Sequence, residues 1–182
     1  GLNGPLLNGR IELDFNGKVI DIKDTSAKLY GGDFILKGRA DDYNNLDITA
    51  QIKNISASDA LKIAKTSPLV KPISGDLSFI KSAEGKTDLT VVFKGKAKSL
   101  EGMGFLDDIH PYGKIVLNSV NALLEPSLQV NRTNGSIDFS KDFNINLNTV
   151  YRGSNISLSG ILSPSARDLT DKNTKIKFDV KT

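Results

Sequence analysis

Apolar and polar residues alternate one by one over long stretches of this chain. From Phe143 to Thr149, asparagines occupy every second position, and the positions between them hold Phe, Ile, Leu and Thr. Successive side chains of a β-strand point to opposite faces, so this pattern predicts strands with one apolar and one wetted face. Similar stretches predict strands at residues 9–15, 18–30, 33–40, 46–54, 73–81, 87–98, 113–120, 127–132, 135–140, 143–151, 154–162 and 174–181.

The links between most of these strands are short and rich in Gly, Asn, Asp and Ser. Such links join successive antiparallel strands, so the sequence predicts a mainly β fold with a long antiparallel sheet of about 10–12 strands. One helix is predicted at residues 57–66, because Ser56 and Asp59 form a capping box and Pro68 and Pro72 end the helix. So short a helix cannot cover a sheet about 50 Å wide at about 4.8 Å per strand, and we expect the sheet to cover its own apolar face by curling or folding over.

Two strand patterns recur along the chain. A glycine followed by Ile or Leu two positions later, and by Phe or Leu four positions later, occurs at Gly9, Gly75, Gly113 and Gly135, and a strand runs into an internal glycine at Gly38, Gly95 and Gly160. Glycine inside a strand often marks a bulge or a sharp bend, so we expect bends at the last three. Chains that repeat one supersecondary unit usually stack it into an array whose function is a surface. We therefore expect one domain over residues 1–182, with an irregular loop at 99–112 between two sub-arrays.

The composition excludes several classes of function. The chain has no cysteine, which excludes thiol catalysis, cysteine-ligated zinc and a disulfide scaffold. Its net charge is +3, but the lysines lie singly and do not cluster with aromatic residues, so no nucleic-acid partner is expected. No run of residues approaches the roughly 18 apolar residues of a membrane helix. Because the first residue is not methionine, we expect the chain to be a segment of a longer protein.

The sequence offers few candidates for a chemical site. His110 is the only histidine; it follows Asp107 and Asp108 closely, but a second imidazole that would complete a metal or acid–base site is missing. Asp41 and Asp42 could bind calcium weakly, although a polar hairpin tip is the commoner role of such a pair. We therefore predict no catalytic residue, no metal site and no cofactor, and we expect that the protein is not an enzyme.

Two longer units of the sequence are similar to each other. The first contains Tyr30, Gly31, Gly32 and Gly38, and the second contains Gly135, Tyr151, Gly153 and Gly160. Between them lies the helical insertion at residues 56–66, followed by Ile73, Ser74, Gly75, Asp76 and Leu77. Together these stretches resemble the repeats of the AsmA-like proteins of the Gram-negative envelope, the group that includes AsmA, TamB and YhdP.

The resemblance implies a long sheet bent into an open, taco-like groove with an apolar interior, in a parent protein anchored in the inner membrane. This chain would be a periplasmic piece of that groove, and it would shield phospholipid acyl chains during transport between the inner and outer membranes. The implied partners are phospholipids or other acyl-chain lipids, the membranes through other parts of the parent protein, and an outer-membrane protein. The residues expected to line the groove are Ile20, Ile22, Phe34, Leu36, Ile48, Ile52, Leu77, Phe79, Leu89, Val91, Phe93, Ile137, Phe139, Ile145, Leu147, Ile156, Leu158, Ile176 and Phe178.

An alternative hypothesis closes the same strands into a β-sandwich or jelly roll that serves adhesion or glycan binding. The chain has no Trp and four Tyr, whereas sugar-binding and adhesive surfaces rely on these rings. A lipid tail, in contrast, needs apolar surface and no directional polar contacts. The composition therefore favours the lipid-binding groove over the closed sandwich.

Overall fold

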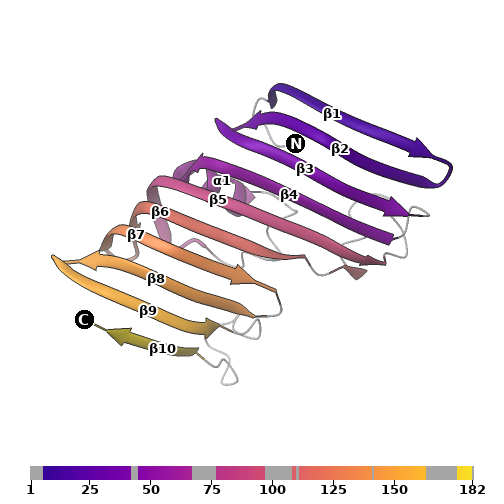
Figure 1. Ribbon diagram of the computed structural model, residues 1–182. Coiled ribbons are helices and arrows are strands. Elements are labelled where there is room, and N and C mark those ends of the chain that lie inside the picture. Colours follow the sequence, from indigo (N-terminus) through magenta and orange to yellow (C-terminus); the bar gives the residue numbers. More distant parts are fainter. Residues whose placement is uncertain are drawn as a thin grey trace.

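A computed structural model of the chain shows ten strands and one helix among the residues that it describes (Figure 1). Those residues are 6–41, 45–66, 77–96, 108–109, 111–140, 142–162 and 176–181. The elements are β1 (Leu6–Asn16), β2 (Val19–Leu29), β3 (Gly32–Asp41), β4 (Asn45–Ser56), α1 (Ala57–Thr66), β5 (Ile80–Lys96), β6 (Tyr112–Leu124), β7 (Leu128–Phe139), β8 (Phe143–Tyr151), β9 (Ser154–Leu162) and β10 (Ile176–Lys181). The predicted fold class, mainly β with one short helix, is confirmed.

The ten strands form one sheet in sequence order, from β1 at one edge to β10 at the other, and every neighbouring pair is antiparallel. A jelly roll requires strands that cross over to non-neighbouring positions, and the described strands do not have that order. β5 and β6 pair over most of their length, so the strands before and after residues 99–112 belong to one sheet.

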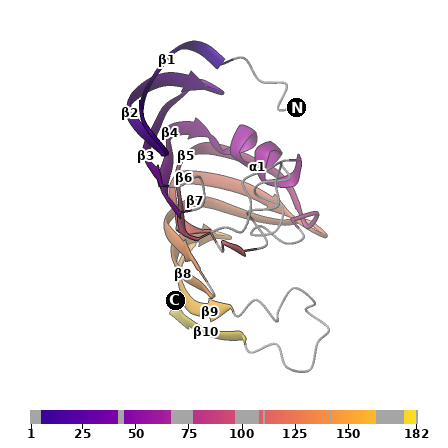
Figure 2. The same ribbon diagram turned by 90° about the vertical axis from the view of Figure 1, so that its right-hand side faces the viewer.

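The sheet is curved, and α1 lies on its concave side (Figure 2). Register shifts interrupt the ladders of four successive strand pairs, from β4 with β5 to β7 with β8. Within these strands Asn54, Ser119 and Arg132 have positive φ angles of 57°, 53° and 50°. Such bulges bend a strand and increase its twist, so this series of bulges contributes to the curvature.

Asp and Asn side chains on neighbouring strands satisfy the backbone N–H groups of these bulges. The N–H of Asn54 donates to Asp88 Oδ1 at 2.7 Å, and that of Ser119 donates to Asn134 Oδ1 at 2.8 Å. The N–H of Arg132 donates to an oxygen of Asn121 at 2.9 Å. All three hydrogen bonds lie at exposed positions, where water could also satisfy the N–H groups, so each side chain adds only modestly to the stability of the bulged conformation.

The internal glycines only partly meet the prediction that they bend the sheet. Gly38 and Gly95 have positive φ angles of 145° and 150°, which side-chain-bearing residues rarely adopt. Gly38, Gly95 and Gly160 all pair with their neighbours without a register shift at the glycine itself, so a bulge occurs at none of the three. Glycine permits a bend but does not impose one.

Several predicted strand boundaries are also wrong. A strand was predicted at 73–81, but in the structure Leu77 to Phe79 form a turn before β5. The Ile80 N–H donates to the Leu77 carbonyl at 3.1 Å and closes this turn. Residues 73–76 of that prediction lie outside the described residues. The strands predicted at 127–132 and 135–140 are one strand, β7. The strands predicted at 73–81 and 87–98 left a break at 82–86, whereas β5 runs from Ile80 to Lys96. The bulges explain this break and the division of β7, because a bulge shifts the phase of the alternation while the strand continues.

Candidate functional site

The register of the sheet places apolar residues of all ten strands on one face. Residues directly opposite each other in an antiparallel pair share a face. One row of such partners runs unbroken from β3 to β10: Phe34, Ile52, Leu89, Ile115, Ile137, Ile145, Gly160 and Phe178. At the other edge, β1 and β2 continue the face with Leu13 opposite Ile22 and Phe15 opposite Ile20.

This apolar face is the concave one. Ile52 belongs to the row just described, and it forms a buried cluster with Ile55 of β4 and Ile63 of α1. Because α1 lies on the concave side of the sheet, the apolar face must be the side towards which the sheet curves (Figure 2).

All but two of the residues predicted to line a groove occupy positions on this face. The exceptions are Leu77 and Phe79, which belong to the turn before β5, and Phe79 is exposed. The prediction failed there because alternation over three residues does not distinguish a strand from the turn that leads into it. Sequence reasoning also missed Ile109, because the apolar residues near it do not alternate with polar ones and so give no periodic signal.

Two elements cover opposite ends of the central strands. At one end, α1 packs its Ile63 against Ile52 and Ile55, and the Ile55 side chain is only 1% exposed. At the other end, Ile109 is also 1% exposed and forms a cluster with Ala40 and Leu46. Leu46 lies next to the start of β4 and Ile55 next to its end, so the two covers lie at opposite ends of one strand, with Ile48 and Ala50 between them.

The part of the concave face farther along the sheet is covered less completely. On β8 and β9, Ile145, Leu147, Ile156 and Leu158 are half-buried and belong to neither of these two clusters of described residues. On β7, the ring of Phe139 lies over the backbone of Gly113, where an added Cβ would come within 2.8 Å of its Cζ atom. The face therefore combines two dry patches on the central strands with half-buried apolar surface beyond them.

The opposite, convex face is mainly polar, although Ile35 and Ile161 are exposed on it, and it carries ion pairs between neighbouring strands. Lys94 Nζ donates to Asp47 Oδ2 at 2.7 Å, and this hydrogen bond together with the charge of the carboxylate raises the pKa of Lys94. Lys114 Nζ lies 3.3 Å from Asp138 Oδ1. Pairs of this kind on the surface add little stability, but they keep this face wetted.

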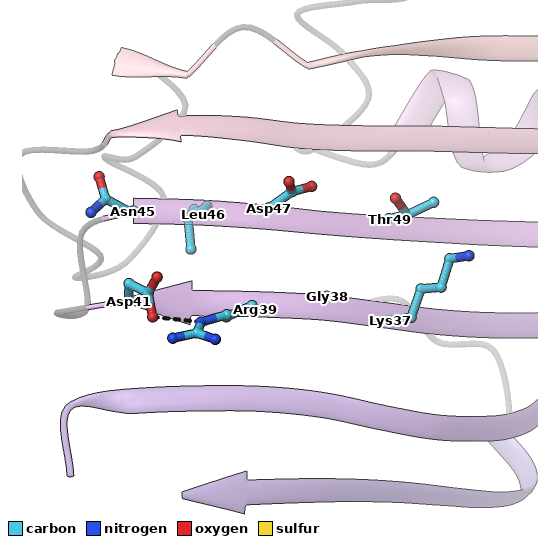
Figure 3. A pocket seen from close by; sticks show the side chains of 8 residues that line it. All are labelled: Lys37, Gly38, Arg39, Asp41, Asn45, Leu46, Asp47 and Thr49. Atoms are coloured by element: carbon cyan, nitrogen blue, oxygen red, sulfur yellow. Dashed lines mark hydrogen bonds and ion pairs between the residues drawn. The ribbon is translucent and has the colours of Figure 1, made fainter. Parts of the chain in front are cut away.

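Two open depressions lie on the convex face. The larger, with a volume of about 450 Å³, is lined by charged and polar residues of β3 and β4, including Lys37, Arg39, Asp41 and Asp47 (Figure 3). Arg39 Nε donates to Asp41 Oδ1 at 2.7 Å across its mouth. The second is lined mainly by Asn and Ser side chains of β6 to β8. Neither lining includes an aromatic residue.

The described residues hold no group of three His, Cys, Asp or Glu side chains that could bind a metal ion. Three candidates from the sequence lie outside the described part of the chain: Asp42, Asp107 and His110. A fourth, Asp41, accepts a hydrogen bond from Arg39. Within that part of the chain, no helix has the length and apolarity to cross a membrane.

Comparison with known proteins gives no relative: the chain matches no family model, no curated protein and no solved structure. The function therefore has to be argued from the two faces of the sheet.

Proposed function

We propose that the concave face binds the acyl chains of lipids and shields them from water, as a segment of an AsmA-like periplasmic bridge that moves phospholipids between the inner and outer membranes. The observation that carries this proposal is the unbroken apolar row from β3 to β10, which β1 and β2 extend to the other edge of the sheet. A continuous apolar face along the whole sheet suits a ligand that moves along it.

The magnitude of acyl-chain burial suits transport better than storage. Each fully buried CH₂ group contributes about 0.8 kcal/mol, so a sixteen-carbon chain with half its surface covered gains on the order of 6 kcal/mol. That value corresponds to a dissociation constant of roughly tens of micromolar before the cost of ordering the chain. A lipid bound in this way is protected from water and can still leave.

The alternative function, glycan binding or adhesion, finds no specific support in the geometry. The polar depressions are on the convex face, and their linings have no aromatic ring on which a sugar could stack. The glycan-binding alternative also gives the continuous apolar face no ligand to contact. The localisation in the periplasm and the partners at each membrane follow from the AsmA-like resemblance and are part of the same proposal.

Native mass spectrometry tests the proposal. The chain is purified without detergent, incubated with vesicles of phosphatidylethanolamine and phosphatidylglycerol, and separated from them before measurement. We expect masses that correspond to the chain with intact phospholipid bound. A chain that is folded by circular dichroism and carries no lipid after this treatment would contradict the proposal.

A further inference from the structure

Two apolar clusters approach each other on β4 from opposite ends of the strand. Ile48 packs against the cluster near the start of β4, and Ile52 belongs to the cluster beneath α1. Ala50 lies between them on the same face and belongs to neither of these clusters of described residues, and the same holds for its partners across the strands, Leu36 on β3 and Val91 on β5. All three are half-buried, and we call this row the slot.

The slot has a low floor and two apolar walls. Ile48 and Ile52 are four residues apart, which places their Cα atoms about 13 Å from each other. Both side chains project from the same face as Ala50, so they narrow the space above it further. The Ala50 side chain is a single methyl group. The slot is therefore a narrow apolar passage across β4.

The width and the chemistry of the slot select its occupant. An α-helix with its side chains is about 10–12 Å wide and does not fit between the two walls. A further β-strand would bring backbone N–H and C=O groups over Leu36, Ala50 and Val91, which offer no hydrogen bond, and leaving such groups unpaired is costly. An unbranched hydrocarbon chain meets neither obstacle, because it is narrow and has no polar group to satisfy.

The row of the slot is filled on the next strand. Val91 lies opposite Gly113 of β6, and the ring of Phe139 lies over the Gly113 backbone. A chain that has crossed β4 must therefore pass to the neighbouring row, in which Leu89 and Ile115 lie opposite each other and are half-buried. That row continues to β10, so the slot leads to the less covered part of the concave face.

We propose that a single acyl chain crosses the central strands in the slot, over Ala50, while α1 stays in place. The two walls limit the passage to one chain, and the small side chain of Ala50 keeps it open. This inference rests on the proposed function, and it adds the position at which the acyl chain crosses β4.

A phospholipid with a photoreactive diazirine in its acyl chain tests this route in the unmodified protein. The chain is incubated with vesicles of phosphatidylethanolamine and phosphatidylglycerol that contain this lipid, irradiated, and digested, and the adducts are located by mass spectrometry. We expect adducts on Ala50 and Val91 in the slot and on Leu147 of β8, and none on Ile55 or Ile63 beneath and on α1.

The possible outcomes separate this inference from the proposed function. Adducts on Leu147 without any in the slot would overturn the inference and leave the proposed function intact. Adducts on Ile55 and Ile63 would show that α1 lifts from the sheet and would also overturn the inference. The absence of adducts from the whole concave face would overturn both.

Filling the slot tests the role of Ala50. We expect Ala50→Phe to lower the yield of adducts on Leu36 and Val91 about tenfold, because the ring displaces the CH₂ groups that lie there, and to leave the yield on Leu147 unchanged. The matched control is Thr49→Phe, which adds the same ring on the convex face and should change none of these yields. If Ala50→Phe unfolds the chain, Ala50→Leu tests the same claim with a smaller side chain. Equal yields on Leu36 and Val91 in the wild type and in a folded Ala50 variant would overturn the role of Ala50.

Discussion

A buried carboxylate should be tolerated at one position of the concave face and not at another. Ile55 lies beneath α1 and is 1% exposed, whereas Leu147 lies on β8 and is half-buried outside the two clusters. Replacing Ile55 with Asp removes about 1.5–3 kcal/mol of apolar burial. It also leaves an unpaired carboxyl group in a dry site, at a further cost of several kcal/mol. The sum is comparable to the whole stability of a typical domain, about 5–15 kcal/mol, so we expect Ile55→Asp to unfold the chain.

At Leu147 the same substitution loses only part of the apolar burial, about 1–2 kcal/mol, because this side chain is only half-buried. If the face is open there, as we propose, the carboxylate also remains in contact with water. We therefore expect Leu147→Asp to stay folded, with at least about 3 kcal/mol between the two variants in urea unfolding followed by circular dichroism. Its affinity for phospholipid should fall, because the charge lies among the acyl-chain positions.

The controls are Leu147→Met, which keeps the face apolar, and Asn146→Asp, which puts the same charge on the convex face one residue away. Both should remain folded and bind lipid. If Leu147→Asp unfolds as completely as Ile55→Asp while these controls stay stable, the face beyond the central strands is a closed dry core and the reasoning is refuted.

Three further predictions concern stability. Gly38→Ala should lower the free energy of unfolding by about 2 kcal/mol or more, because the φ of Gly38 is 145° and an added Cβ would overlap a backbone oxygen of β4. Gly17→Ala, in open space at a φ of 60°, should lower it by about 1 kcal/mol. Equal unfolding midpoints for the two variants would contradict this. Ser56→Ala should lower the stability of the fold by about 1 kcal/mol, because it removes the N-cap of α1, in which the Asp59 N–H donates to Ser56 Oγ at 3.1 Å. Ser56→Thr keeps a hydroxyl at the cap and should retain most of this stability. The raised pKa of Lys94 contributes stability below the ordinary lysine value of roughly 10.4, and this contribution is lost as pH rises through the folded-state pKa. We expect the thermal midpoint of the wild type to decrease more than that of Lys94→Met as the pH is raised through this range. Equal decreases in the two proteins would exclude the contribution of Lys94.

Local signals in the sequence were sufficient to predict most elements of this fold. The helix was predicted at residues 57–66 and α1 spans Ala57–Thr66, because the Ser56 cap and the prolines that follow are local signals. The strands around Leu36 and Leu147 follow from period-two alternation in the same way. Because neighbouring strands are also neighbours in sequence, one apolar face was predictable from the strands alone.

The bulges and the covers of the face were not predictable, because they depend on which residues meet across strands. Nothing local marks Asn54 or Ser119 as a bulge; each is stabilised by a side chain that the register brings to it. No local pattern marks Ile109 as a core residue either, and it is buried because it packs against Ala40 and Leu46. The sequence therefore predicts which face is apolar, but not which parts of that face are covered.

Site-specific photocrosslinking tests the central claim most directly. A photoreactive phenylalanine analogue is placed at Leu147 on the concave face or at Asn146 on the convex face, in chains incubated with phospholipid vesicles and irradiated. The account predicts covalent phospholipid adducts at position 147 and few at position 146, although the two are neighbours in sequence. Adducts of equal yield at both positions, or adducts at 146 alone, would contradict the claim that the concave face binds acyl chains.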